Sequence, residues 1–184
     1  DNGSRDHRVR MVFPAGAETL ADVRAETAFG VDRRPARREV PRQVRNELPV
    51  SYGPTISFVD AGEAKGATVF GIGLAEYEAY PRDDTTGPRI GLTLLRCVGD
   101  LSRDDLATRP SGHAGPGLPT PGAQCLGVHH FRLAFEPRGG EPPAAALFAR
   151  SAAFVNPPRV VSAAGAAGSG AAGASFITIE APGR

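Results

Sequence analysis

The chain has 184 residues, which is enough for one domain with a sizeable core and short for two. Its 21 basic and 20 acidic side chains leave a net charge of +1, too balanced to predict attraction to nucleic acid or to a membrane surface. No apolar run approaches the roughly 20 residues that span a bilayer. The polar opening DNGSRDHRVR is unlike a signal peptide and lacks an initiating Met. We therefore expect a cytoplasmic chain, cut from a longer one, without nucleic-acid or membrane partners.

Polar and apolar residues alternate with a period of two along most of the chain, which is typical of half-buried strands. The segments predicted as strands are, in chain order, residues 8–13, 20–31 (a strand or a short helix), 55–60, 67–80 (one or two strands), 89–98, 123–135, 160–161 and 175–180. Residues 33–45 form a basic, proline-interrupted loop, and residues 142–154 are the best helix candidate. Strands without regular helices between them predict one all-β domain over residues 1–184, an antiparallel β-sandwich with few short helices.

One stretch of low complexity, residues 163–174, consists of Ala, Gly and Ser and predicts a flexible loop. Part of it, GSGAAG, has the spacing of a dinucleotide-binding fingerprint. That fingerprint needs a strand before it and a helix after it, whereas a strand-like run follows here. The segment is therefore interpreted as a loop within the domain.

Cys97 and Cys125 lie 28 positions apart, and the chain has no CxxC pair, which excludes a zinc ribbon or a thioredoxin-type site. Two small buried thiols are the favoured interpretation. A disulfide between neighbouring strands would need an oxidising compartment, and the sequence does not decide whether the two residues are bridged.

The chain shows no catalytic constellation that sequence alone can select. His129 and His130 are adjacent in a predicted strand, so their rings would point to opposite faces and could not bind one metal ion. A glycosidase needs two carboxylates that flank the sugar. The candidate pairs are Asp83 with Asp84, Asp104 with Asp105, and Glu76 with Glu78, for which solvated loop charges or a solvent-facing strand are the ordinary explanations. We predict no catalytic residue and no metal ligand.

A resemblance is carried by motifs that follow one another in a fixed order. Residues 6–8 (DHR) open an alternating strand that ends in Phe13-Pro14, and residues 73–78 read GLAEYE. The further matching pieces are residues 92–96 (LTLLR), 98–99 (VG), 101–103 (LSR), 108–110 (TRP), 114–116 (AGP), 120–121 (TP) and 123–127 (AQCLG). This ordered set resembles the C-terminal β region of glycoside hydrolase family 38, the α-mannosidases, with Ala75 where the family usually has proline.

The resemblance implies a particular place in a larger enzyme. These α-mannosidases are retaining and zinc-dependent, with an N-terminal catalytic domain, a helical bundle and C-terminal sandwiches similar to galactose mutarotase. Their zinc ligands and nucleophile belong to the N-terminal part, so this chain is expected to be a non-catalytic β domain with no cofactor of its own. Its implied partners are the catalytic and helical domains and the α-mannoside substrate.

The resemblance also assigns a possible substrate-binding loop, residues 103–109 (RDDLATR), which in the family reaches toward the catalytic cleft. Arg109 would bind sugar hydroxyls with its guanidinium fork, and Asp104 and Asp105 would hold that fork in place. The alternative is a salt-bridged loop that joins two strands or contacts the helical bundle. An autonomous carbohydrate-binding or mutarotase-like module, or a pure scaffold domain, also remains possible for the chain as a whole.

Overall fold

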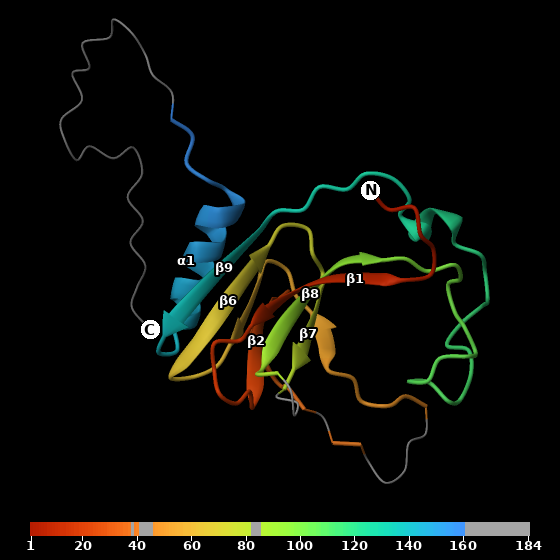
Figure 1. The fold of residues 1–184 in the computed structure, drawn as a ribbon, viewed down its shortest axis with the longest axis horizontal. Helices are drawn as coiled ribbons and strands as arrows, with labels where there is room; N and C mark the ends of the chain where they lie inside the picture. The colour runs from red at the N-terminus through yellow and green to blue at the C-terminus, as the bar shows by residue number, and fades with distance from the viewer. Residues whose placement is uncertain (38, 41–45, 82–85, 161–184) are drawn as a thin grey trace, which may run out of the picture.

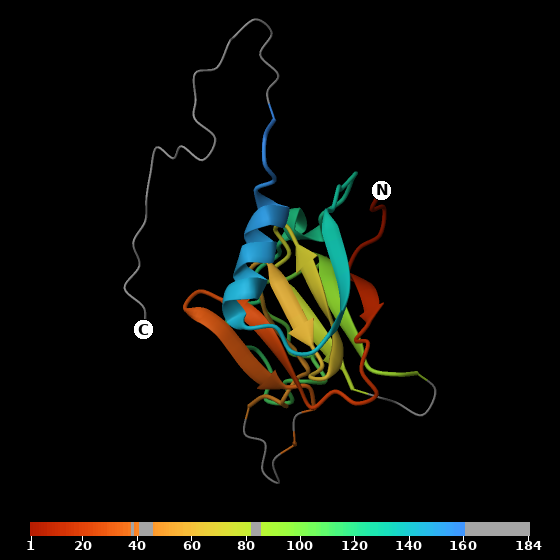
Figure 2. The same ribbon diagram turned by 90° about the vertical axis from the view of Figure 1, so that its left-hand side faces the viewer.

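The computed structural model of the chain describes residues 1–37, 39–40, 46–81 and 86–160. Two antiparallel sheets pack face to face, and one helix covers the outer side of one of them (Figures 1 and 2). The first sheet has the strand order β1 (Arg8–Pro14), β8 (Arg89–Arg96), β7 (Glu76–Tyr80), β4 (Tyr52–Pro54). The second has the order β3 (Gly30–Pro35), β2 (Asp22–Thr27), β5 (Phe58–Ala61), β6 (Lys65–Gly71), β9 (Leu133–Gly139). The predicted all-β sandwich is confirmed.

The pairing combines local hairpins with two long-range contacts. β2 and β3, β5 and β6, and β7 and β8 are neighbours in sequence and pair antiparallel. β1 instead pairs with β8, and β9 with β6, so the beginning and the later part of the described chain complete the two sheets. Phe13 of β1 stacks on Phe135 of β9 at a ring-centroid distance of 5.3 Å, which joins the two sheets along one side.

Alternation along the strands creates two hydrophobic cores. Val59 and Val69 point between the sheets, whereas their neighbours Phe58 and Phe70 point to the outer face of the second sheet. The helix α1 (Ala144–Val155) covers that outer face, and its Leu147 is fully buried against the two phenylalanines. The central core lies between the sheets and includes Leu20, Val23, Ala25, Val59, Val69, Leu74, Tyr77, Ile90 and Leu92.

The helix agrees with the sequence prediction for residues 142–154. Pro143 stands at its N-cap, where a missing backbone N–H costs nothing, and the alanine-rich segment that follows has high helix propensity. Leu147 and Ser151, four residues apart, are the buried face, and the Ser151 hydroxyl lies within hydrogen-bond distance of the Ser57 hydroxyl beside β5. No helix of the described residues is long and apolar enough to cross a membrane.

The prediction of one continuous strand over residues 123–135 is wrong. A 3-10 helix, η1 (Pro121–Gln124), extends into this range, Cys125 follows in the left-handed backbone region with φ of 49°, and β9 starts only at Leu133. Proline at the start of η1 removes a ladder donor, and a left-handed residue turns the chain out of a strand. His129 and His130 therefore lie in an irregular segment rather than a strand.

Two ambiguous predictions are resolved and others lie outside the described residues. Residues 20–31 form β2 and the start of β3, and residues 67–80 contain most of β6 and all of β7. The basic stretch predicted as a loop from residue 33 begins inside β3. Val160 belongs to no strand. Val161, the loop at 163–174, the strand at 175–180 and the pair Asp83 and Asp84 lie outside the described part of the chain.

Candidate functional site

A loop over residues 98–120 leaves the sheet at the end of β8 and returns at η1, and backbone hydrogen bonds close its base. The Val98 N–H donates to the Ala123 carbonyl at 3.3 Å, and the Thr120 N–H donates to the Gly99 carbonyl at 2.7 Å. Farther out, the Leu101 N–H donates to the Leu118 carbonyl at 2.8 Å. These hydrogen bonds hold the two ends of the loop side by side. We call this base, residues 98–99 and 120–123, the neck of the loop.

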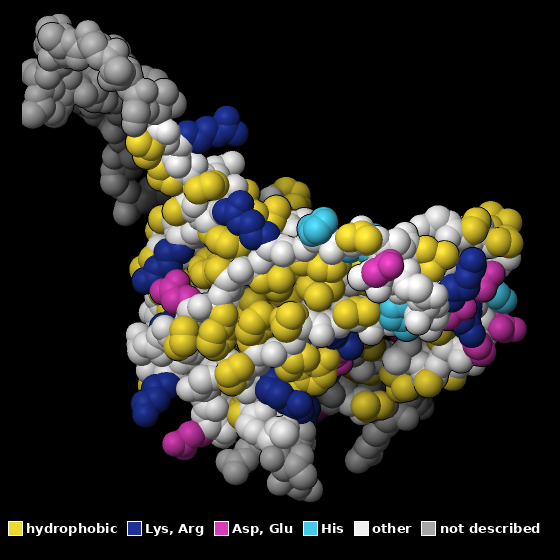
Figure 3. Space-filling view, turned by 45° about the horizontal axis from the view of Figure 1, so that its top comes forward, with side chains coloured by type: hydrophobic (Ala, Val, Ile, Leu, Met, Phe, Trp, Pro, Cys, Tyr) yellow, Lys and Arg dark blue, Asp and Glu magenta, His cyan; other side chains and the backbone are white. Residues whose placement is uncertain are grey.

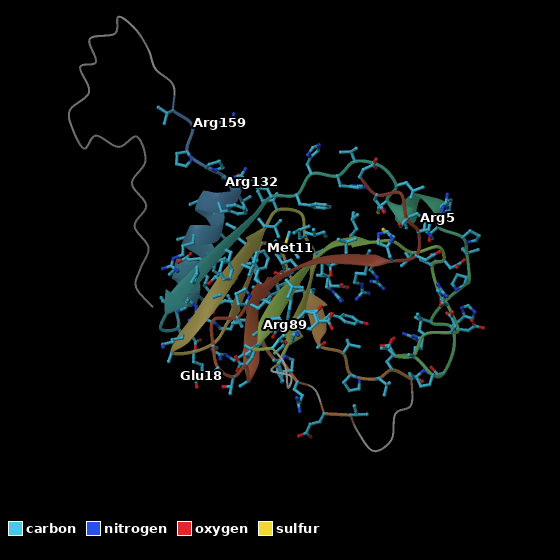
Figure 4. All side chains as sticks on the ribbon, viewed as in Figure 1. Arg5, Met11, Glu18, Arg89, Arg132 and Arg159 are labelled. Atoms are coloured by element: carbon cyan, nitrogen blue, oxygen red, sulfur yellow. The ribbon has the colours of Figure 1, made fainter. Side chains whose placement is uncertain are left out.

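The N-terminal segment supports the neck of this loop. The Gln124 side chain is 2% exposed; its Oε1 accepts a hydrogen bond from the Asp6 backbone N–H at 2.8 Å, and its Nε2 donates to Asp6 Oδ1 at 2.9 Å. A substituent on Gly99 would contact the same Asp6 carboxylate. In Figure 4, Arg5 on this N-terminal segment is drawn beside η1. Gln124 stands in one of the family-like motifs, but its structural role follows only from the approach of residues 2–7.

A cavity of about 450 Å³ lies between the loop and the segment that leads into β4. The two walls are joined by the Leu48 N–H, which donates to the Thr108 carbonyl at 2.8 Å. Polar and charged side chains reach the cavity from three places: Arg96 from the end of β8, Arg103 and Arg109 from the loop, and Tyr52 from β4. Guanidinium groups and an aromatic ring are groups that bind the hydroxyls and apolar faces of sugars.

Arg109 lines this cavity, but Asp104 and Asp105 do not hold it. Arg109 forms an ion pair with Glu47 on the opposite wall, and its side chain is 22% exposed. The Arg109 N–H donates to the Leu106 carbonyl at 2.9 Å, and this turn separates its side chain from the aspartates. The predicted support of Arg109 by the two aspartates is therefore wrong in its contacts, whereas its role toward substrate stays a prediction.

The two aspartates line a neighbouring hollow of about 380 Å³ together with His113. Arg103 donates from Nε to Asp105 Oδ1 at 2.8 Å, and this bond lowers the pKa of the Asp105 carboxyl. Asp104 Oδ2 lies 3.9 Å from His113 Nε2. Arg103 lines both hollows, as do Asp100 and Ser102, so the three predicted site residues lie along two adjoining hollows.

A polar network on the outer face of the first sheet is a feature that sequence reasoning missed. Arg10 of β1 lies between two carboxylates of β7, with Nη1 2.5 Å from Glu78 Oε2 and Nη2 3.7 Å from Glu76 Oε1. The Thr93 hydroxyl donates to Glu76 Oε1 at 2.7 Å, and the Tyr80 hydroxyl donates to Glu78 Oε2 at 3.1 Å. Burial, followed by the nearby Glu78 charge, raises the pKa of Tyr80.

The network gives Glu76 and Glu78 a structural rather than a solvent-facing position. Both side chains are 17% exposed, although the sequence favoured solvated charges. The opposite charges on alternate residues of two strands were the available signal. These charges predict ion pairs only if the strand order β1–β8–β7 is already known, and sequence alone does not provide that order. Because their oxygens are engaged by arginines and hydroxyls, the two carboxylates do not form an acid/base pair open to a substrate.

The described part of the chain has no set of side chains suited to bind a metal ion. No group of three or more His, Cys, Asp or Glu side chains there could hold a metal ion. His129 uses Nε2 in a 2.7 Å contact with the Cys125 carbonyl, and its ring stacks on Phe131. The described residues therefore do not fit a zinc ion.

Comparison with known proteins adds one finding. No family model and no curated protein sequence matches the chain. Among solved structures, a glycosyl hydrolase family 38 protein from Enterococcus faecalis superposes with a TM-score of 0.58 and 28% identity over 84% of this chain. The chain resembles a part of a glycoside hydrolase family 38 protein. It covers 15% of the length of that family 38 protein.

The structural match agrees with the motif resemblance found in the sequence. The part of the chain that the two share is the sandwich described above, so the family 38 likeness extends to fold as well as to ordered motifs. It associates the chain with glycoside hydrolases. The match involves only 15% of the family 38 protein. The shared fold therefore does not transfer the activity of that whole protein to this chain.

Proposed function

We propose that the chain acts as a non-catalytic β domain of an α-mannosidase-type glycoside hydrolase and that its 98–120 loop lines the cleft in which the mannoside is hydrolysed. The observation that carries this proposal is the likeness, at 28% identity, of 84% of this chain to 15% of a family 38 protein. A chain of this kind would support a catalytic domain and a helical domain that bring the zinc ion and the nucleophile.

The partners of the acidic side chains support a non-catalytic role. Hydrolysis with retention needs one carboxylic acid and one free carboxylate about 5–5.5 Å apart on either side of the glycosidic bond. Glu76 and Glu78 are tied to Arg10 and to neighbouring hydroxyls, and Asp105 is tied to Arg103. Asp104 Oδ2 lies 3.9 Å from His113 Nε2 in a hollow that Asp6, Asp100 and Asp105 also line, and of these Asp6 is engaged by Gln124 and Asp105 by Arg103.

An exposed hydrophobic surface supports docking to other domains. Met11 and Val12 of β1 are 45% and 43% exposed, and Phe135 of β9 is 38% exposed. Figure 3 shows hydrophobic side chains gathered across this face of the molecule, and Figure 4 labels Met11 on β1. Large apolar surface of this kind marks contact sites between domains or proteins.

The cavity favours an alternative, an autonomous carbohydrate-binding module. Its volume of about 450 Å³ is within the range of small-ligand sites. Arg96 is well placed for this, because its side chain is 61% exposed and its Nη1 is 4.0 Å from Glu76. The ion pair between Arg109 and Glu47 also fits the simpler explanation, in which the loop is held against the β4 segment without touching sugar.

We expect the 184-residue chain to release no phenol from an aryl α-mannoside, with or without added zinc. The reason is that the described residues offer no metal site and that the Glu76, Glu78 and Asp105 carboxylates are engaged by arginines. Turnover that a chelator abolishes would contradict the non-catalytic assignment. In parallel, titration with methyl α-mannoside followed by NMR distinguishes the alternative: saturable shifts at millimolar or lower concentration would favour an autonomous sugar-binding module.

In the complete hydrolase, replacement of Arg109 by Ala is expected to lower kcat/KM by about 10–100-fold, the loss of one or two charge-assisted hydrogen bonds. Arg109→Lys should recover only part of this, because an ammonium cannot reproduce the guanidinium fork. Arg150→Ala is the matched control, since Arg150 lies on α1 and pairs with Glu136. Unchanged kinetics in a folded Arg109→Ala enzyme would remove Arg109 from the site and leave it as a support of the loop.

A further inference from the structure

The two cysteines bracket the 98–120 loop and meet at its neck. Cys97 follows the last residue of β8, and Cys125 caps η1. Neither is in a disulfide; Cys97 is 2% exposed, and Cys125 is partly exposed. The hydrogen bond from the Val98 N–H to the Ala123 carbonyl, at 3.3 Å, holds the two chain segments side by side. Cysteines 28 positions apart in sequence are thus brought together by the closure of the loop.

A single side chain contacts both cysteine residues. Asn2 Nδ2 lies 3.4 Å from Cys97 Sγ and 2.8 Å from the Cys125 carbonyl oxygen, and it also donates to the Gln124 carbonyl at 3.1 Å. Burial raises the pKa of the Cys97 thiol, and the neighbouring Cys125 thiol raises it further, as expected for two side chains close enough to interact.

A histidine stands beside the buried thiol. His7 Nε2 is 3.9 Å from Cys97 Sγ, and His7 Nδ1 is buried without a hydrogen-bond partner among the described residues. A hollow of about 310 Å³ opens onto this pair and is also lined by Arg8, Arg96 and Arg103. His7 is thus the imidazole that lies beside the Cys97 sulfur, through Nε2.

We propose that Cys97 and Cys125 are a disulfide-forming pair that covalently closes the neck of the 98–120 loop when the chain meets a low-molecular-weight disulfide such as glutathione disulfide. The inference does not depend on the function proposed above. It concerns a modification of this chain alone, and it holds for any role of the loop.

The reaction proceeds in two exchanges. The partly exposed Cys125 thiol loses its proton and attacks one sulfur of glutathione disulfide; a mixed disulfide forms, and one glutathione thiolate leaves and takes up a proton. The Cys97 thiol then passes its proton to His7, and its sulfur attacks Cys125 Sγ. The Cys97–Cys125 bond forms, and the second glutathione leaves as a thiolate that accepts the proton. The two cysteines are oxidised, and one glutathione disulfide is reduced to two glutathione molecules.

The order of the two steps follows from the surroundings of each thiol. Cys97 is too buried to meet a tripeptide disulfide and has a raised pKa, so its thiolate is scarce at neutral pH. Cys125 is the accessible partner. Cys97 is therefore the resolving thiol, which acts only after the mixed disulfide has formed next to it.

The bond would restrict the loop that carries Arg103 and Arg109. A crosslink between residues 97 and 125 removes the conformational freedom of the intervening segment from the unfolded chain, which predicts a rise in Tm of about 5–10 °C. The same crosslink would hold the neck closed if the bonds from Asn2 and Gln124 break.

The test incubates the folded 184-residue chain with increasing ratios of oxidised to reduced glutathione, quenches with acid and measures the intact mass. The expected product has lost two hydrogen atoms and carries no glutathione. Trypsin cleavage within the loop after Arg103 then gives two pieces that stay joined in denaturant until a reductant is added; Arg109 is not a site, because Pro110 follows it. Such joined pieces map the bond to this pair.

Two variants identify the roles of the thiols. Cys97→Ser is expected to accumulate the glutathione adduct on Cys125, whereas Cys125→Ser should leave Cys97 unmodified in the folded chain. If either variant fails to fold, the mass and cleavage of the unaltered chain still decide. The proposal is overturned if the folded chain keeps both thiols under conditions that oxidise the urea-unfolded chain, or if the only disulfides formed join two chains.

Discussion

Replacing Asp60 with Asn is expected to lower the free energy of unfolding by about 3–5 kcal/mol. Asp60 is 1% exposed, and its carboxylate lies between two guanidinium groups from strands on either side of β5 in the second sheet. Arg24 of β2 donates to Oδ2 through Nη2 at 2.6 Å, and Arg138 of β9 donates to Oδ1 through Nε at 2.7 Å. Thr68 adds a hydroxyl hydrogen bond to Oδ1 at 2.7 Å.

The size of the effect comes from what the substitution leaves behind. An amide of the same shape keeps one acceptor oxygen but loses the negative charge, so the Arg138 guanidinium loses its carboxylate partner and Arg24 keeps only Glu141, at 2.9 Å. The Arg138 side chain is only 5% exposed and that of Arg24 is 11% exposed, so water cannot replace the lost partner. A loss of this size is a large part of the roughly 5–15 kcal/mol that stabilises a typical domain.

Urea unfolding measures the change as a shift of the midpoint at an unaltered slope. Asp22→Asn is the matched control, because Asp22 also pairs with an arginine, Arg33, but the two side chains are 28% and 44% exposed. That exposed pair should contribute less than about 1 kcal/mol. Equal, small effects for both variants would show that Asp60 is more hydrated, or less tightly paired, than its contacts indicate.

The strands that were predicted well are those whose own pattern determines their conformation. β1 alternates polar and apolar residues, β8 is an apolar run with β-favouring residues, and α1 combines a proline start with a run of alanines, so local propensity and pattern agree in these elements. Residues 123–135 also contain apolar sequence, but the end of η1 and the left-handed Cys125 interrupt it. A left-handed cysteine has no signature in the sequence, so this boundary could not be predicted.

The candidate site was located by its sequence only in part. The loop containing Arg109, Asp104 and Asp105 was singled out, yet the partner of Arg109 is Glu47, which lies 62 positions earlier and reaches it only because β4 joins the first sheet beside β7. Likewise, Asp60 meets Arg138 only through the pairing of β5, β6 and β9. Charged residues separated by long loops have no local rule that pairs them, so such contacts require the strand order.

The second large effect is expected for Phe58→Ala, which should cost about 3–5 kcal/mol of unfolding free energy. Phe58 is fully buried on the outer face of β5, where its ring contacts Phe70 at 6.5 Å and Phe148 of α1 at 5.5 Å between centroids. Removing the ring leaves a cavity between the sheet and the helix that the rigid strands cannot fill. Because Leu147 packs into the same cluster, the helix would lose its main attachment.

Phe29→Ala makes the same chemical change at a fully exposed position in the turn between β2 and β3, and it should alter stability by no more than about 0.5 kcal/mol. Urea unfolding of both variants, followed by circular dichroism for the helix and by fluorescence of the three tyrosines, Tyr52, Tyr77 and Tyr80, all in the first sheet, gives the comparison. Coincident transitions that move together in Phe58→Ala would show that α1 and the sandwich unfold as one unit. If the helix signal is lost at a much lower urea concentration than the fluorescence change, α1 is held only by Phe58 and its neighbours. The two-sheet core between β1 and β9 would then be stable without the helix.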